Sequence, residues 1–140
     1  MALMPKKVKY RKSQRGKTRG LSSRGSRLTF GEFGLKSLEN GLIRNNHIEA
    51  VRVVVARKTH GLGKLWINIF PHKSITKKPA ETRQGSGKGD IAAWVAVVKR
   101  GKVLFEIGGI PEDLARIVFR LVAFKLPVKT KFITRAGDGQ

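Results

Sequence analysis

The sequence predicts an α+β domain, in which two helices pack on a mostly antiparallel sheet, preceded by a basic extended arm. Apolar residues alternate in several short segments, as in strands with one buried face, and recur at helical spacing in two others. The first 27 residues carry ten Lys or Arg and no Asp or Glu. We therefore divide the chain into an arm (1–27), a globular domain (28–135) and a tail (136–140).

The first half of the domain begins with strands and continues into a helix. Alternating apolar residues between Leu28 and Leu35 predict strands interrupted by Gly31 and Gly34. Asn46 with Glu49 three residues later fits a capping box, so a helix should begin there and end near residue 58. Residues 65–70 then alternate as a strand that ends at a proline.

The second half predicts a long loop, a hairpin, a helix and a last strand. Residues 72–90 are polar, and loops of this length are usually functional. Segments 93–99 and 102–107 read as two strands joined by a tight hairpin at Arg100-Gly101. A helix should begin at Pro111 and stop before Pro127, followed by a strand over 128–133. The buried stripe predicted for this helix is Leu114, Ile117, Val118 and Leu121.

Charge is the strongest functional signal. Thirty Lys and Arg against nine Asp and Glu give a net charge of +21 in 140 residues, which indicates a polyanionic partner such as nucleic acid. The chain has no cysteine, so disulfides and thiolate metal sites are excluded. No apolar run approaches the roughly 18 residues of a membrane span. These features predict a cytoplasmic protein without a membrane partner.

The candidate RNA-binding residues lie in the arm and in the long loop. Arginine grips phosphate with two hydrogen bonds, and glycine lets the backbone lie close to it. The arm should stay extended or disordered until it meets phosphate. A mitochondrial targeting peptide is the competing interpretation, against which the glycines and the missing apolar stripe argue. The candidates are Lys6, Lys7, Lys9, Tyr10, Arg11, Lys12, Arg15, Lys17 and Arg19 in the arm and Lys77, Lys78, Arg83, Gly85, Gly87 and Lys88 in the loop.

Aromatic residues offer a second kind of RNA contact, because bases stack on their rings. Tyr10 lies in the arm, which has no core to receive it, and is the better stacking candidate. Trp66 and Trp94 each lie in a predicted strand among apolar neighbours. For these two residues core packing is the favoured interpretation.

Nothing in the sequence supports catalysis, a cofactor or a small-molecule substrate. Residues 85–89 resemble a P-loop, but Thr82 stands where the motif needs glycine and Gly89 where it needs Ser or Thr. His47, His60 and His72 are isolated and match no metal-ligand spacing. Two alternatives stay open: a DNA-compacting chromosomal protein and a nucleotide-dependent enzyme built on residues 85–89.

A series of short segments, spread over nearly the whole chain, carries a further signal. They are Met4–Lys12, Phe30–Leu35, Ile48–Ala50, Lys64–Ile67, Ile69–Pro71, Thr76–Arg83, Gly85–Gly89, Trp94–Lys99 and Lys125–Pro127. In this order they resemble the bacterial large-subunit ribosomal protein family L-sixteen, and the resemblance runs nearly from end to end.

The resemblance implies a fold similar to the α/β hammerhead and a role in the large ribosomal subunit. It implies binding to large-subunit (23S-type) rRNA beside neighbouring ribosomal proteins, participation in late assembly, and contact with tRNA in the aminoacyl site, with peptidyl-site tRNA as a further candidate. Segments 6–19 and 77–88 match the family's RNA-facing parts. Asn68 and Gln84 depart from its pattern, where a basic residue and a methionine are usual. Some bacterial members are hydroxylated on the arginine that matches Arg83.

Overall fold

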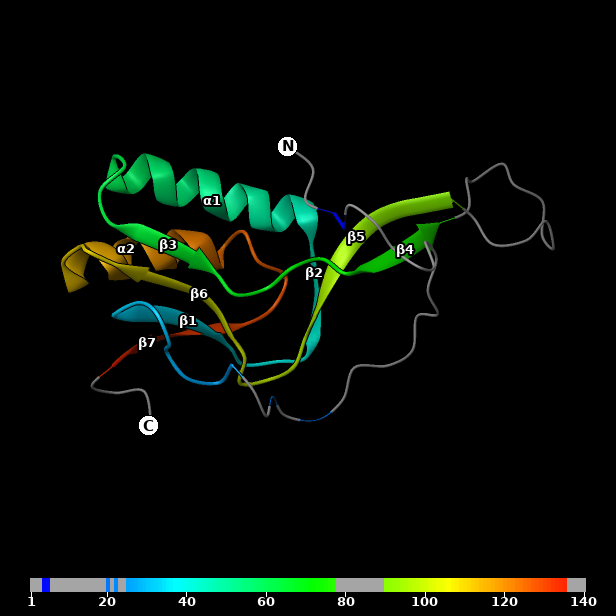
Figure 1. The fold of residues 1–140 in the computed structure, drawn as a ribbon, viewed down its shortest axis with the longest axis horizontal. Coiled ribbons are helices and arrows are strands. Elements are labelled where there is room, and N and C mark those ends of the chain that lie inside the picture. Colours follow the sequence, from blue (N-terminus) through cyan, green and yellow to red (C-terminus); the bar gives the residue numbers. More distant parts are fainter. Residues whose placement is uncertain (1–3, 6–19, 21, 23–24, 78–89, 136–140) are drawn as a thin grey trace.

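The computed structural model describes residues 4–5, 20, 22, 25–77 and 90–135. Its strands form two antiparallel sheets, ordered β3-β6-β1-β7 and β2-β5-β4 (Figure 1). Two helices pack on this framework, which confirms the predicted α+β class and divides the expected sheet into two. The elements are β1 (Phe33–Ser37), β2 (Gly41–Arg44), α1 (Asn45–Thr59), β3 (Lys64–Ile67), β4 (Lys73–Lys77), β5 (Asp90–Val98), β6 (Val103–Gly108), α2 (Glu112–Ala123) and β7 (Thr130–Thr134).

The main core lies where the two helices meet the four-stranded sheet. Ile48 and Val51 of α1, Val118 and Phe119 of α2, and Phe105 of β6 are each at most 1% exposed. Burying a side chain of this kind stabilises the fold by about 1.5–3 kcal/mol. The smaller sheet contributes Ile43 of β2 and Val98 of β5 to the same core, and the β4–β5 pair projects from the body of the molecule (Figure 1).

The predicted hairpin between residues 93 and 107 is wrong. Its two strands exist as β5 and β6, but they lie in different sheets. The turn between them bonds to the end of β1 instead: the amide of Gly101 donates to the carbonyl of Ser37 (2.8 Å), and the amide of Ser37 donates to the carbonyl of Lys102 (2.8 Å). The amide of Lys102 donates to the carbonyl of Lys99 (3.1 Å), so the tight turn forms. The carbonyl of Lys102, however, bonds to Ser37, and no ladder joins β5 to β6.

Helix α1 begins at Asn45, one residue before the predicted N-cap Asn46, and its N-cap is Arg44. The ring Nδ1 of His47 accepts a hydrogen bond from the amide of Arg44 (3.2 Å), the role predicted for Glu49. Burial and the nearby Arg44 guanidinium lower the pKa of His47, which favours the neutral ring that can accept this bond. Glu49 instead pairs with Arg52 on the helix surface.

The buried face of α2 is shifted from the predicted stripe. Ala115, Val118, Phe119 and Val122 are buried, whereas Ile117 is 53% exposed. Of the four residues in the predicted stripe, Val118 alone is buried. The large ring of Phe119 contacts the ring of Phe132 in β7, with centroids 6.0 Å apart, so the helix is oriented by its contact with the sheet.

The strand boundaries also differ from prediction. Residues 28–31 form no strand, and Gly34 lies within β1 rather than interrupting it. A Cβ on Gly34 would meet the side chain of Leu28 at 2.5 Å, so the glycine leaves room for that residue against the sheet. β3 ends at Ile67, before the expected residue 70, and the expected loop from residue 72 begins as strand β4.

The packing of α2 gives a direct test. Phe119→Ala should lower the free energy of unfolding by about 3–5 kcal/mol, because it removes a buried ring from the core. Phe124→Ala is the matched control, since Phe124 is 79% exposed just beyond the same helix. Its effect should stay within about 0.5 kcal/mol. Urea unfolding of both variants measures this, and equal losses would contradict the assigned helix face.

Candidate nucleic-acid interface

The structure shows where the two predicted RNA-binding segments leave the folded domain. Arm residues 6–19 and loop residues 78–89, which include nearly all the candidates, lie outside the described residues. Lys77 is described as the last residue of β4, where its backbone pairs with Asp90 of β5. The structure therefore brings no predicted side chains together. It does show the residues at which each segment joins the folded domain, and we call these residues the root of the segment.

The root of the loop is the β4–β5 ladder. These strands are antiparallel from Lys73, paired with Val95, to Lys77, with a register irregularity after Ile75. The ladder projects away from both helices, toward one end of the molecule (Figure 1). Residues 77 and 90, which flank the segment 78–89, are therefore paired with each other in one ladder.

The root of the arm is bonded along the turn before β6 and along β6 itself. The amide of Ser22 donates to the carbonyl of Arg100 (2.9 Å), and the amide of Val103 donates to the carbonyl of Gly25 (2.7 Å). Leu28 is buried against Val103 and Ile133 in a small second core. The chain is therefore fixed to the domain from residue 25 onward.

A buried carboxylate completes the root of the arm. One oxygen of Glu106 accepts hydrogen bonds from the successive amides of Thr29 (2.8 Å), Phe30 (2.9 Å) and Gly31 (3.0 Å). The other oxygen accepts one from the side-chain amide of Asn68 (2.5 Å). Glu106 is 0% exposed, in the middle of the fully buried strand β6.

These hydrogen bonds also determine the charge state of Glu106. Burial by itself raises the pKa of a carboxyl group, but the bonds from Gly31, Asn68, Phe30 and Thr29 outweigh it. The pKa of Glu106 is therefore lowered, and the group is ionised at neutral pH. Sequence reasoning missed Glu106, although an acid inside an apolar strand segment is an available signal. Asn68, noted as a departure from the family pattern, is now explained as its partner.

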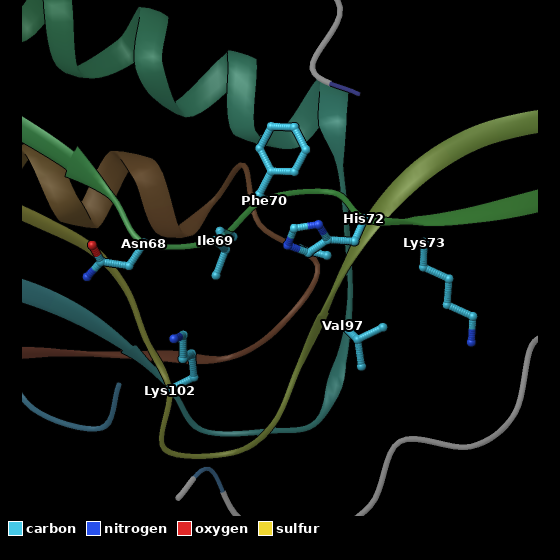
Figure 2. A pocket seen from close by; sticks show the side chains of 8 residues that line it. Asn68, Ile69, Phe70, His72, Lys73, Val97 and Lys102 are labelled. Atoms are coloured by element: carbon cyan, nitrogen blue, oxygen red, sulfur yellow. The ribbon is translucent and has the colours of Figure 1, made fainter. Parts of the chain in front are cut away.

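A basic cavity lies between the two roots. Its volume is about 330 Å³, and the residues that line it include His72, Lys73 and Lys102 but no acid. Figure 2 shows the side chains around it, with Asn68 and Ile69 from the segment after β3, Val97 from β5 and Lys102 from the turn before β6. The ring of Phe70 contacts that of His72, with centroids 5.1 Å apart.

This cavity has the chemistry of a phosphate or ribose contact. Ammonium groups attract phosphate oxygens, and an imidazole can donate to either a phosphate or a hydroxyl group. Lys102 belongs to the turn that holds the arm, and Lys73 begins the ladder that carries the loop. A nucleic acid bound to both segments would therefore pass near this cavity.

Among the described residues, no group of three or more His, Cys, Asp or Glu side chains could hold a metal ion. No described helix combines the length and apolar character needed to cross a membrane.

Comparison with known proteins decides the family. The sequence profile of the family described as "Ribosomal protein L16p/L10e" matches residues 5–133. The chain belongs to this family. The "Large ribosomal subunit protein uL16" of Methylacidiphilum infernorum (isolate V4) is 55% identical over 135 residues, which are 96% of this chain and 94% of that protein. The resemblance inferred from the sequence segments is therefore confirmed.

Membership in the L16p/L10e family determines the broad role. The chain is a ribosomal protein, so it binds RNA, works in translation and is located in the ribosome in the cytoplasm. The family consists of structural ribosomal proteins rather than enzymes, and this leaves the nucleotide-dependent enzyme without support. The DNA-compacting alternative loses its basis too, because the ribosomal role accounts for the excess of positive charge.

The buried carboxylate yields a stability prediction. Glu106→Gln places an amide beside Asn68 and removes the charge that three backbone amides stabilise, which should cost about 1.5–3 kcal/mol at pH 7. The pKa of Glu106 is lowered in the folded state, so its contribution is complete above the unfolded-state value of about 4.3 and lost as pH falls further. The difference from wild type should therefore shrink below about pH 4.

The control is Glu112→Gln at the start of α2. Its side chain is half-exposed and forms only a 3.6 Å surface pair with Arg116, so the change should cost less than about 1 kcal/mol. Urea unfolding between pH 3 and pH 8 measures both variants. A loss for Glu106→Gln no larger than that of the control would contradict the role of the network.

Proposed function

We propose that this chain is a structural protein of the large ribosomal subunit that binds large-subunit rRNA through its arm and loop. It supports late subunit assembly and contacts tRNA in the aminoacyl site, with peptidyl-site tRNA as a further candidate. Its partners are then rRNA, tRNA and neighbouring large-subunit proteins. The observation that carries the proposal is the pair of basic segments, 6–19 and 77–88, rooted on either side of one basic cavity.

The proposed mechanism is electrostatic attachment from a rigid base. The arm contributes Lys and Arg without any acid, so each contact with phosphate releases condensed counterions. The folded domain fixes the starting points, because Glu106 holds residues 29–31 and the β4–β5 ladder holds residues 77 and 90. The arm and the loop, which extend from these points, then adapt to the shape of the RNA.

The glycines of the loop support a close approach to RNA. Gly85 and Gly87 flank a serine just before Lys88, and glycine bares its backbone amide to an oxygen ligand. Arg83 precedes them and can grip a phosphate with two hydrogen bonds. This composition supports docking of the loop into folded RNA near a tRNA site.

Binding to rRNA should depend steeply on salt. If the arm and loop neutralise about ten phosphates, log K should fall against log salt with a slope of roughly −7 to −9. Filter binding of the full chain to an isolated large-subunit rRNA fragment, from about 50 to 400 mM KCl, measures the slope. A slope shallower than about −3 would mean that most of these charges do not touch phosphate.

The loop arginine provides a functional test. Arg83→Ala should leave folding intact but slow late subunit assembly or weaken tRNA binding in the aminoacyl site. A lost charge-assisted contact is worth about 1.5–3 kcal/mol, roughly tenfold or more in affinity. Arg57→Ala is the matched control, because Arg57 is exposed near the end of α1.

Subunit yield and tRNA affinity are measured for ribosomes that carry each variant. For Arg83→Ala, the subunit yield, the tRNA affinity or both should be clearly lower than for wild type. For Arg57→Ala, both quantities should equal the wild-type values. Wild-type values for Arg83→Ala, with the protein fully incorporated, would assign the loop to an ordinary solvated surface.

A further inference from the structure

A second surface with a different chemistry lies at the edge strand of the larger sheet. We name it the aromatic shelf and define it by Phe30, Lys64 and Trp66 with the residues that line the adjoining cavity of about 280 Å³. The rings of Phe30 and Trp66 are nearly parallel, 15° apart, with centroids separated by 6.1 Å. The Nζ of Lys64 lies 5.4 Å from the Trp66 ring centroid. The remaining lining residues are Gly31, Glu32, Gly63, Gly108 and Gly109.

Both rings are held in place by the backbone beneath them. The amide of Phe30 is bound by the buried Glu106, and Trp66 pairs directly with Glu106 across β3 and β6. Yet Phe30 is 58% exposed, and Trp66 is only partly buried, contrary to the core position expected for it; Trp94 is 5% exposed and confirms that expectation. The aromatic shelf is thus an ordered pair of rings, of which Phe30 is the more exposed.

The floor of the aromatic shelf is bare backbone. Gly63 has a φ of +73°, and a Cβ there would meet the carbonyl oxygen of Gly108 at 2.5 Å. The close approach of these two segments therefore requires glycine. With no side chains on the floor, a flat ligand can lie beside the rings. The cavity volume of about 280 Å³ is below the roughly 300–1,000 Å³ usual for drug-sized ligands, so it suits a smaller group.

The position and charge of the aromatic shelf separate it from the basic cavity. It lies where β3 begins and β6 ends, at the opposite end of the molecule from the projecting β4–β5 ladder (Figure 1). Its lining includes Glu32, whereas that of the basic cavity includes no acid. A carboxylate repels phosphate but accepts hydrogen bonds from the amino groups of bases.

We infer that the aromatic shelf binds a single unstacked nucleobase of RNA, a proposal that rests on the proposed RNA-binding function. The base stacks on the exposed ring of Phe30. Lys64 meets the adjoining phosphate, and Glu32 accepts a hydrogen bond from an exocyclic amino group, which favours adenine, cytosine or guanine over uracil. An apolar side chain of a neighbouring protein is the competing occupant, but it would leave the charged groups of Lys64 and Glu32 without a ligand to bind.

The experiment uses the full chain and two single-stranded RNA probes of equal length: an adenosine octamer and an octamer of abasic ribose phosphates. Both carry the same phosphates, so both should bind the arm and loop, but only the first can stack. The reporter is tryptophan fluorescence, since the chain contains two tryptophans and Trp94 is buried. Filter binding measures total affinity in parallel.

The adenosine octamer should quench Trp66, and the abasic octamer should bind without quenching. Phe30→Ala should raise the concentration for half-maximal quenching by about fivefold or more, the usual effect of losing one base–aromatic stack. Phe124→Ala, which removes an even more exposed ring elsewhere, should change neither quenching nor affinity. Trp94→Phe should keep the full quenching, and if that variant fails to fold, the Phe30 and Phe124 pair still decides.

Equal quenching by both probes, or none by either despite tight binding, would overturn the nucleobase site. The second result would leave the neighbouring-protein occupant as the alternative. If neither probe binds at low salt, the proposed RNA-binding function fails rather than the aromatic shelf alone. The two failures are therefore distinguishable.

Discussion

The carboxylate of Glu106 accepts hydrogen bonds from three successive backbone amides and from Asn68, and much of the structure depends on this arrangement. A buried charge is costly unless its oxygens are satisfied. The donors come from the arm root and from the segment that leads to the smaller sheet, so β6 can keep Glu106 buried only while both segments are in place. The exit of the arm and the path toward the loop are thereby fixed by the same group.

Three other described acids also serve the fold. Glu39 accepts a bond from the amide of Lys129 (2.7 Å), Glu49 pairs with Arg52, and Glu112 pairs with Arg116. These contacts use negative charge to hold turns and helices within the molecule. Since the whole chain has only nine acids against thirty bases, little negative charge is left to offset the basic surface. Compaction of such a chain is most favourable beside RNA phosphate.

Sequence reasoning predicted both helices and most of the strands because hydrophobic period is a local property, but it missed β2 and placed β4 in a loop. It failed where a distant partner decides. Alternation over 93–107 cannot show that β5 and β6 join different sheets, and the face of α2 depends on Phe132, which lies beyond the helix. The charge of Glu106 is visible in the sequence, but its three amide partners are about 75 residues away. The composition of the arm and loop pointed to RNA binding, while their contacts belong to residues outside the described part of the chain.

The two described surfaces suit two different tasks in RNA recognition. Contacts between ammonium groups and phosphate supply affinity but carry no base identity. The basic cavity, lined by Lys73 and Lys102, offers groups suited to this kind of contact. A base on the aromatic shelf would instead be read by stacking and by Glu32, neither of which depends on counterion release. Because the cavity and the shelf lie on one rigid framework joined through β6, binding at both would fix the distance between two RNA segments. A flexible basic chain alone cannot impose such a distance.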